Sequence, residues 1–259
     1  MLALLPTVVA ALRSLAAYVV VSLYVALTAP PGILIALLIR RANLLYWLGR
    51  QGVRLGLATV GIRYRATGDQ HIQPDRPTVY CVNHASNLEP PVVFMVLAAV
   101  HPRLRVLYKA EIHQIPLLST VLDTAGWVPI QRRNREQSRA AIESAAKALR
   151  DGNSFLIFPE GTRSRTGELL PFKKGGFVMA VKGRAAIVPV TILGTHQAMR
   201  KGSSIIRPVT VSVRVGAPIA TAEVEDRDAL AASTRAAMQD LLAAGPIAGP
   251  AGVRGTAHG

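Results

Sequence analysis

The sequence has 259 residues, enough for one sizeable α/β domain with an appendage but too few for several independent cores. Hydrophobic residues make up 50% and the mean hydropathy is +0.31, while 30 lysines and arginines against 15 aspartates and glutamates give a net charge of +15. High apolarity together with high positive charge favours a protein that lies against anionic lipid; a basic surface that is merely solvated is the alternative. Aromatic residues make up only 5% and no basic stripe carries stacking side chains, so we expect no nucleic-acid partner.

The amino-terminal part contains an uncharged apolar run, Leu15 to Ile39, which is long enough to cross a hydrocarbon core, since about 20 residues suffice. Two prolines and a glycine at positions 30–32 interrupt it, so that one spanning helix and two shorter helices are both compatible with the pattern. A secretory signal fits less well, because the run begins late and Arg40 and Arg41 follow it. We therefore expect a membrane anchor.

The charges on either side of this run predict its orientation. Arg13 alone precedes it, whereas a series of arginines follows it: Arg40, Arg41, Arg50, Arg54, Arg63 and Arg65. Because positive residues concentrate on the cytoplasmic side, we expect an anchor in the cell membrane with the rest of the chain on the cytoplasmic face. Residues 44–57 suit an interfacial helix whose arginines reach the headgroups, or else a helix packed on the core. We assign residues 1–57 to membrane-anchor and interfacial helices.

The remainder of the chain alternates predicted strands and helices. Short apolar or β-branched runs predict strands at 78–82, 105–108, 154–158, 187–193 and 209–215. We expect the strand at 209–215 to be half-exposed, because its valines alternate with polar residues. Strands that are separated by helices indicate an α/β fold, which we expect to be a single mixed sheet flanked by helices.

Two helix starts and a tail complete this organisation. Pro90 and Pro91 suit the first turn of a helix, where a missing N–H costs little. Asn134, with a glutamine three residues on, is typical of a capped helix start. We assign residues 58–243 to one catalytic domain, and we expect residues 244–259, which are rich in Gly, Ala and Pro, to form a disordered tail.

The stretch CVNHASNLEPP raises the question of catalysis, because His84 follows a predicted strand and Glu89 precedes two prolines. Residues five apart are about 140° apart on a straight helix, so the two side chains need the bend of a loop to meet. If they meet, they form a general base and the carboxylate that orients it. From these residues alone, Glu89 as a complement to a helix dipole, with Asn83 or Asn87 as a cap, is the simpler interpretation.

The only cysteine, Cys81, lies beside this histidine. A single cysteine excludes an intramolecular disulfide and a cysteine-based zinc site, and we expect no metal. Cys81 is expected to pack inside a strand, since free cysteine is commonly buried; a nucleophilic thiol is the less favoured alternative.

Four stretches in order along the chain resemble the motifs of the glycerolipid acyltransferases, the 1-acylglycerol-3-phosphate acyltransferase family. They are Asn83 to Glu89, Gly126 to Arg132, Phe158 to Ser164, and Val188 to Val190 with Gly194 beyond. The family's first motif is His, four residues, Asp, whereas this chain has Glu89. The additional methylene moves the carboxylate outward by about 1.5 Å, and we expect that it still orients His84.

The resemblance implies roles for individual residues. His84 and Glu89 become the catalytic pair, and Arg163 resembles the third-motif contact to the acceptor's phosphate. Arg132 and Lys109 are further candidates for that phosphate. Supporting roles in the motifs fall to Asn83, Ser86, Glu160, Gly161, Thr162 and Pro189.

The activity that the resemblance implies is acyl transfer at a phospholipid membrane. A fatty acyl group would pass from acyl-CoA or acyl carrier protein to the sn-2 hydroxyl of lysophosphatidic acid, giving phosphatidic acid, with no cofactor beyond the co-substrate. Other acceptors fit the same motifs: another lysophospholipid, glycerol 3-phosphate or a glycolipid. Hydrolysis of acyl thioesters, and a lipid-binding scaffold with a decayed catalytic pair, are the alternatives from other functional classes.

Overall fold

The computed structural model describes residues 5–115, 118–131, 134–221 and 226–248. Its centre is a seven-stranded sheet in the order β1-β7-β6-β2-β5-β3-β4. The strands are β1 Arg63–Thr67, β2 Thr78–Val82, β3 Leu104–Lys109, β4 Val128–Ile130, β5 Ser154–Ile157, β6 Ala186–Leu193 and β7 Thr210–Val215. The pairing of β6 with β7 is antiparallel, whereas the other pairs are parallel. The expected single mixed sheet is confirmed.

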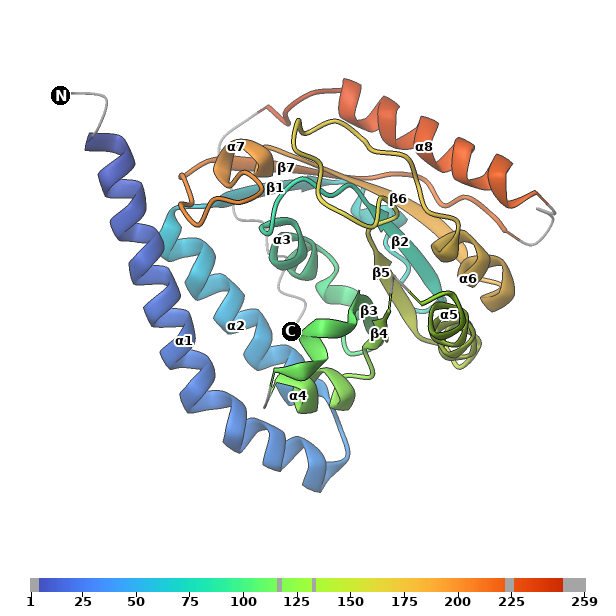
Figure 1. The fold of residues 1–259 in the computed structure, drawn as a ribbon, viewed down its shortest axis with the longest axis horizontal. Coiled ribbons are helices and arrows are strands. Elements are labelled where there is room, and N and C mark those ends of the chain that lie inside the picture. The colour runs from blue at the N-terminus through green and yellow to red at the C-terminus, as the bar shows by residue number, and fades with distance from the viewer. Residues whose placement is uncertain (1–4, 116–117, 132–133, 222–225, 249–259) are drawn as a thin grey trace.

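Helices cover both faces of this sheet, which explains why β2 is an uninterrupted apolar run (Figure 1). Side chains alternate along β2, so Tyr80 and Val82 join one core and Val79 and Cys81 join the other. The first core includes residues of α2 (Asn43–Val60) and α3 (Glu89–Val96). The second includes residues of α5 (Arg135–Arg150), α6 (Gly175–Gly183) and α8 (Arg227–Ala243). Shorter elements connect them: η1 Asp69–His71, η2 Ala98–Val100, η3 Ala110–Gln114, α4 Leu118–Thr124 and α7 Thr195–Ala198.

The amino-terminal apolar run forms one helix, α1 (Leu5–Ile39), which continues through both prolines and packs along α2. It bends in the half that contains Pro30 and Pro31 (Figure 1). By length and composition α1 is able to cross a membrane, and only 17% of its most apolar window is buried. Of the two possibilities open from the sequence, the single helix is therefore the one adopted. Because Ala17 contributes to the first core, α1 and α2 lie on the same side of the sheet as α3.

Several elements match their predictions. Strand β2 has the predicted bounds, and the Asn134 side chain caps α5 by accepting hydrogen bonds from the backbone N–H groups of Glu136 and Gln137.

Strand β7 departs from the expected half-exposed pattern, because Ser212 is buried together with the valines. The Ser212 hydroxyl accepts a hydrogen bond from the backbone N–H of Ile247, so chain that follows α8 covers this strand.

The boundaries of the expected units can be compared with these elements. Helix α2 continues to Val60, beyond the boundary placed after residue 57. Within the expected tail, the carbonyl of Ile247 accepts a hydrogen bond from Arg65, and residues 249–259 lie outside the described part of the chain. The division into anchor, catalytic domain and tail stays a prediction.

Candidate active site

Three of the four motifs meet at one edge of the sheet. Strands β6, β2 and β5 are adjacent and parallel, so their carboxyl ends lie side by side. His84 follows β2, the loop from Phe158 to Ser164 follows β5, and Gly194 of the fourth motif follows β6. In open α/β sheets ligands bind at this edge. The second motif includes β4, which lies at the outer edge of the sheet beyond β3.

The structure brings His84 and Glu89 together. The Nδ1 atom of His84 lies 2.7 Å from Oε2 of Glu89, and helix α3 begins only at Glu89, so the preceding loop supplies the expected bend. The His84 side chain is 17% exposed and that of Glu89 is fully buried. Because a carboxylate accepts, Nδ1 carries the proton and Nε2 keeps a lone pair. No hydrogen bond within the described residues occupies that Nε2 atom.

Glu89 also accepts hydrogen bonds from backbone N–H groups of the loop that precedes α3. The N–H of Ala85 lies 3.0 Å and 2.9 Å from its two carboxylate oxygens, and the N–H of Ser86 lies 3.0 Å from Oε2. Glu89 lies in the first turn of α3, where a carboxylate complements the helix dipole as in the simpler interpretation, and it contacts the histidine as well. The hydroxyl of Thr195 donates a further hydrogen bond of 2.6 Å to Oε1.

Asn83 does not take the capping role that the simpler interpretation gave to Asn83 or Asn87. The Asn83 side chain instead bonds to β6: its Nδ2 donates to the carbonyl of Ile192 at 3.0 Å, and its Oδ1 accepts from the N–H of Ile192 at 2.7 Å. Ser86 anchors the other end of the loop, because its hydroxyl donates to the carbonyl of Met199 at 2.8 Å. The N-cap residue of α3, Leu88, makes no side-chain cap. These motif residues hold the loop in place.

The third motif contacts both the ring and the backbone of His84. The ring of Phe158 stacks on the imidazole with centroids 4.1 Å apart. Oε1 of Glu160 accepts a hydrogen bond from the backbone N–H of His84 at 2.7 Å, and the N–H of Ser164 donates to the His84 carbonyl at 2.7 Å. Burial raises the pKa of Glu160, although hydrogen bonds from the backbone of Leu170 and His84 lower it. Glu160 thus shapes the loop by accepting from two backbone groups.

Two other motif residues have backbone roles. Gly161 has a φ of +69°, a conformation that favours glycine. Pro189 lies in β6 just before the residues that pair with β7, so its missing N–H falls outside that ladder. Its carbonyl accepts a hydrogen bond from Gly216 at 2.8 Å.

The three candidates for binding a phosphate have different surroundings. Arg163 is half-buried in the third-motif loop. Lys201, which belongs to none of the four motifs, donates from Nζ to the Arg163 carbonyl at 2.9 Å and to the Thr162 hydroxyl at 3.3 Å. Lys109 is the last residue of β3 and pairs with Glu111 at 3.1 Å. Arg132 lies outside the described residues. The structure therefore places a second cation, Lys201, beside Arg163.

The environment of Cys81 decides whether its thiol is able to act as a nucleophile. Cys81 is fully buried in β2, and its burial raises the pKa of the thiol. A thiol in this environment is not a nucleophile. The described residues contain no cluster of three or more histidines, cysteines or carboxylates able to hold a metal ion.

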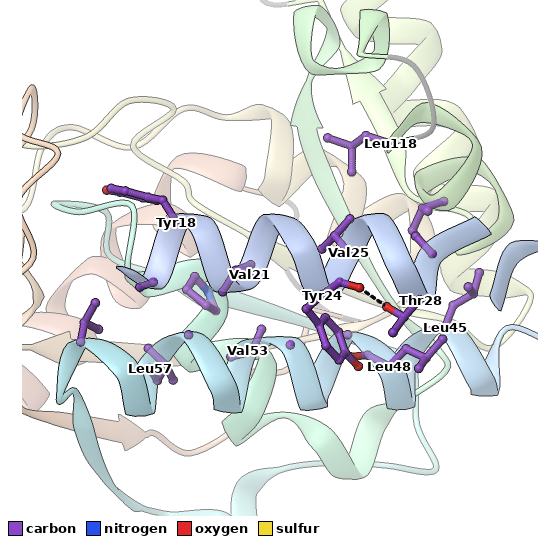
Figure 2. Close-up of a pocket in the computed structure, with 18 of the residues that line it drawn as sticks. Tyr18, Val21, Tyr24, Val25, Thr28, Leu45, Leu48, Val53, Leu57 and Leu118 are labelled. Carbon is purple, nitrogen blue, oxygen red and sulfur yellow. Dashed lines mark hydrogen bonds between the residues drawn. The ribbon is translucent and has the colours of Figure 1, made fainter. Parts of the chain in front are cut away.

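An apolar groove runs between α1 and α2 (Figure 2). Its volume is about 620 Å³, and Leu88 and Pro91, which flank Glu89, line part of it. The hydroxyl of Tyr24 donates to the Leu48 carbonyl at 2.9 Å, and that of Thr28 to the Tyr24 carbonyl at 2.8 Å. Because backbone carbonyls satisfy both hydroxyls, the groove presents a nearly continuous apolar surface.

Curated proteins resemble this chain in sequence. A protein from Cocos nucifera named 1-acyl-sn-glycerol-3-phosphate acyltransferase is 38% identical over 149 residues, which are 57% of this chain and 47% of that protein. One of the same name from Limnanthes douglasii is 35% identical over 162 residues, 62% of this chain and 56% of that one. The chain thus spans about half the length of these curated relatives.

A solved structure gives the fold-level comparison. The crystal structure of the 1-acyl-sn-glycerophosphate acyltransferase PlsC from Thermotoga maritima superposes with a TM-score of 0.81 at 22% identity, covering 95% of this chain and 100% of that one. The model of the family described as Acyltransferase matches residues 63–193, from the start of β1 to the end of β6, and this range contains His84, Glu89 and the third-motif loop. The chain therefore belongs to the acyltransferase family.

Proposed function

We propose that the protein transfers a fatty acyl group from acyl-CoA or acyl carrier protein to the sn-2 hydroxyl of lysophosphatidic acid, giving phosphatidic acid. The observation that carries this proposal is the His84–Glu89 pair, whose Nε2 is not occupied by another described residue, at the edge of an apolar groove. The names of the curated relatives support the choice of acceptor.

His84 acts as a general base in this scheme. Its Nε2 takes the proton from the acceptor's hydroxyl as that oxygen attacks the thioester carbonyl, and the Glu89 carboxylate stabilises the imidazolium that develops. When the tetrahedral intermediate collapses, the carbon–sulfur bond breaks and the thiolate takes the proton from His84. The products are the ester and the free thiol, so the step needs no acyl-enzyme, in keeping with the burial of Cys81.

Arg163 and Lys201 are the basic residues that we assign to the acceptor's phosphate. Arg163 lies in the loop after β5, which also contacts His84 through its backbone, and Lys201 reaches this loop from the segment after α7 by donating to the Arg163 carbonyl. Arginine offers a phosphate two parallel hydrogen bonds and lysine adds a point charge. A phosphate held there fixes the distance between the acceptor's headgroup and the base.

The groove and helix α1 support action at a membrane. Large apolar side chains are exposed along α1, including Leu12, Leu27 and Leu38. We place α1 in the cell membrane with the catalytic domain on the cytoplasmic face, because arginines concentrate after the helix. A substrate acyl chain then enters the groove from the bilayer and does not cross water.

Replacement of the catalytic pair tests the scheme. His84→Ala is expected to lower kcat by about a hundredfold or more, because the general base is lost, and Glu89→Ala is expected to lower it substantially. Glu89→Asp should stay within about tenfold of the wild type, since a carboxylate remains. The measurement is release of CoA and formation of labelled phosphatidic acid by purified protein in lipid micelles.

The same assay separates transfer from hydrolysis. Release of CoA should require the acceptor, whereas equal release without it would identify a thioesterase. Unchanged turnover in Glu89→Ala would overturn the catalytic pair, and an acyl-enzyme on the productive path would contradict direct transfer.

A change at Arg163 tests the phosphate site. Arg163→Gln is expected to raise the KM for lysophosphatidic acid by about ten- to a hundredfold, because charge-assisted hydrogen bonds are lost, while the KM for acyl-CoA changes little. Arg139→Gln, an exposed arginine on α5, removes the same charge elsewhere and serves as the control. An equal effect on both substrates would count against the assignment.

A bulky side chain in the groove tests its proposed occupant. Val25→Trp is expected to lower kcat/KM for long-chain acyl-CoA or long-chain acceptor by about tenfold while short chains are much less affected, because the indole fills space that only a long chain needs. Leu27→Trp is the matched control, since Leu27 is 75% exposed on the same helix and does not line the groove. Uniform loss across chain lengths in Val25→Trp would argue against a chain in the groove.

A further inference from the structure

The carboxylate of Glu89 has donors that are divided unequally between its two oxygens. Oε2 accepts from Nδ1 of His84 and from two backbone N–H groups. Oε1 accepts from one of these same N–H groups, that of Ala85 at 3.0 Å, and from the Thr195 hydroxyl at 2.6 Å. Thr195 is therefore the only side chain among the described residues that bonds to Oε1, and its distance lies in the range of strong hydroxyl-to-carboxylate bonds.

We propose that Thr195 is a positioning residue for acyl transfer, which sets the rotation of the Glu89 carboxylate so that Oε2 faces His84. This inference rests on the proposed function and adds a residue that none of the four motifs identified. Thr195 acts through Glu89 and touches no reacting atom. Without its hydroxyl, Oε1 keeps only the Ala85 N–H that it shares with Oε2, so rotation about the last bond of the side chain is less restricted.

Thr195 is itself held rigidly, as a positioning residue must be. Its side chain is 1% exposed, and it is the first residue of α7. Gly194 before it has a φ of +106°, and a Cβ there would lie 3.2 Å from the carbonyl oxygen of Thr210, so the turn that aims Thr195 requires glycine. Figure 1 shows α7 next to α3, the helix that begins with Glu89.

The segment around Thr195 is joined to the His84 loop at three points. Ile192 bonds to the side chain of Asn83, Thr195 bonds to Glu89, and the Met199 carbonyl accepts from Ser86. The outer two contacts fix the distance between the segments, and the central one reaches the catalytic pair. The segment from Ile192 to Met199 therefore contacts the His84 imidazole indirectly, through the carboxylate of Glu89.

The contact between Thr195 and residue 89 depends on the length of the glutamate side chain. Its side chain is longer by one methylene than the aspartate of the motif, and it reaches His84 and Thr195 at once, at 2.7 Å and 2.6 Å. A shortened carboxylate retracts by about one bond and loses one of these two partners. The structure therefore pairs Glu89 with Thr195, and Glu89→Asp is expected to depend less on the Thr195 hydroxyl.

Steady-state kinetics of two variants test the proposal. Thr195→Val keeps the shape and removes the donor, and it is expected to lower kcat by roughly ten- to a hundredfold with the KM of both substrates within about threefold. Thr195→Ser restores the hydroxyl and should recover most of the lost rate. Thr234→Val, which removes a hydroxyl that is fully buried in α8 and bonds to the Leu230 carbonyl, controls for the loss of a buried donor and should keep the wild-type kcat.

A double-mutant cycle separates positioning from a structural role. In a Glu89→Ala background, Thr195→Val should cause no further loss beyond about twofold, because its partner is absent. Additive losses, a rise in KM with unchanged kcat, or failure of Thr195→Ser to recover activity would overturn the proposal. Thermal unfolding of each variant shows whether a loss of rate is a loss of folded protein.

A readout independent of turnover keeps this test distinct from that of the proposed function. Nitrogen NMR of the histidine ring, with the His84 signals assigned by their absence in His84→Ala, should show one Nδ1-protonated form in the wild type and in Thr195→Ser, and a changed or averaged signal in Thr195→Val. If the wild type transfers no acyl group but the ring responds to Thr195→Val, the proposed function fails and the positioning role stands. If turnover is normal and neither ring nor rate responds, the positioning role fails alone.

Discussion

The site depends on the hydrogen bond between His84 and a carboxylate that is entirely out of contact with water. Burying a carboxylate costs several kcal/mol unless donors surround it. Glu89 meets that condition with the backbone N–H groups of Ala85 and Ser86, the imidazole and the Thr195 hydroxyl. Since these donors come from two segments of the chain, the loop after β2 and the turn after β6, the carboxylate holds its orientation only while the strands keep their neighbours.

The parallel pairing of β6, β2 and β5 provides those neighbours. Each strand ends in one part of the site, so the sheet sets the distances between parts that are far apart in sequence. The other constraint comes from the two faces. One face packs against α5, α6 and α8, and the other against α2 and α3, with α1 outermost. The edge that carries His84 thus lies beside the apolar helices, and Leu88 and Pro91, on either side of Glu89 in sequence, line part of the groove between α1 and α2.

Much of this arrangement could be predicted from the sequence, where local pattern determines structure. The run 78–82 reads as a buried strand, Asn134 caps a helix, and the loop between His84 and Glu89 allows them to meet. Strand β1 was missed because Arg63 and Arg65 make it look like a flanking charged segment, although an edge strand tolerates them. Thr195 and Lys201 were missed because their partners lie 106 and 38 residues away, and only the sheet order places them together.

The groove also determines which variable controls the reaction rate, if it holds a substrate chain as proposed. Its walls are α1 and α2, and α1 is mostly uncovered along its apolar length. A chain that enters there comes from the surrounding lipid, where concentration is a two-dimensional quantity. At a fixed concentration of acyl donor, turnover then follows the mole fraction of the acceptor in the bilayer: diluting the vesicles with buffer leaves it unchanged, whereas adding inert phospholipid slows it.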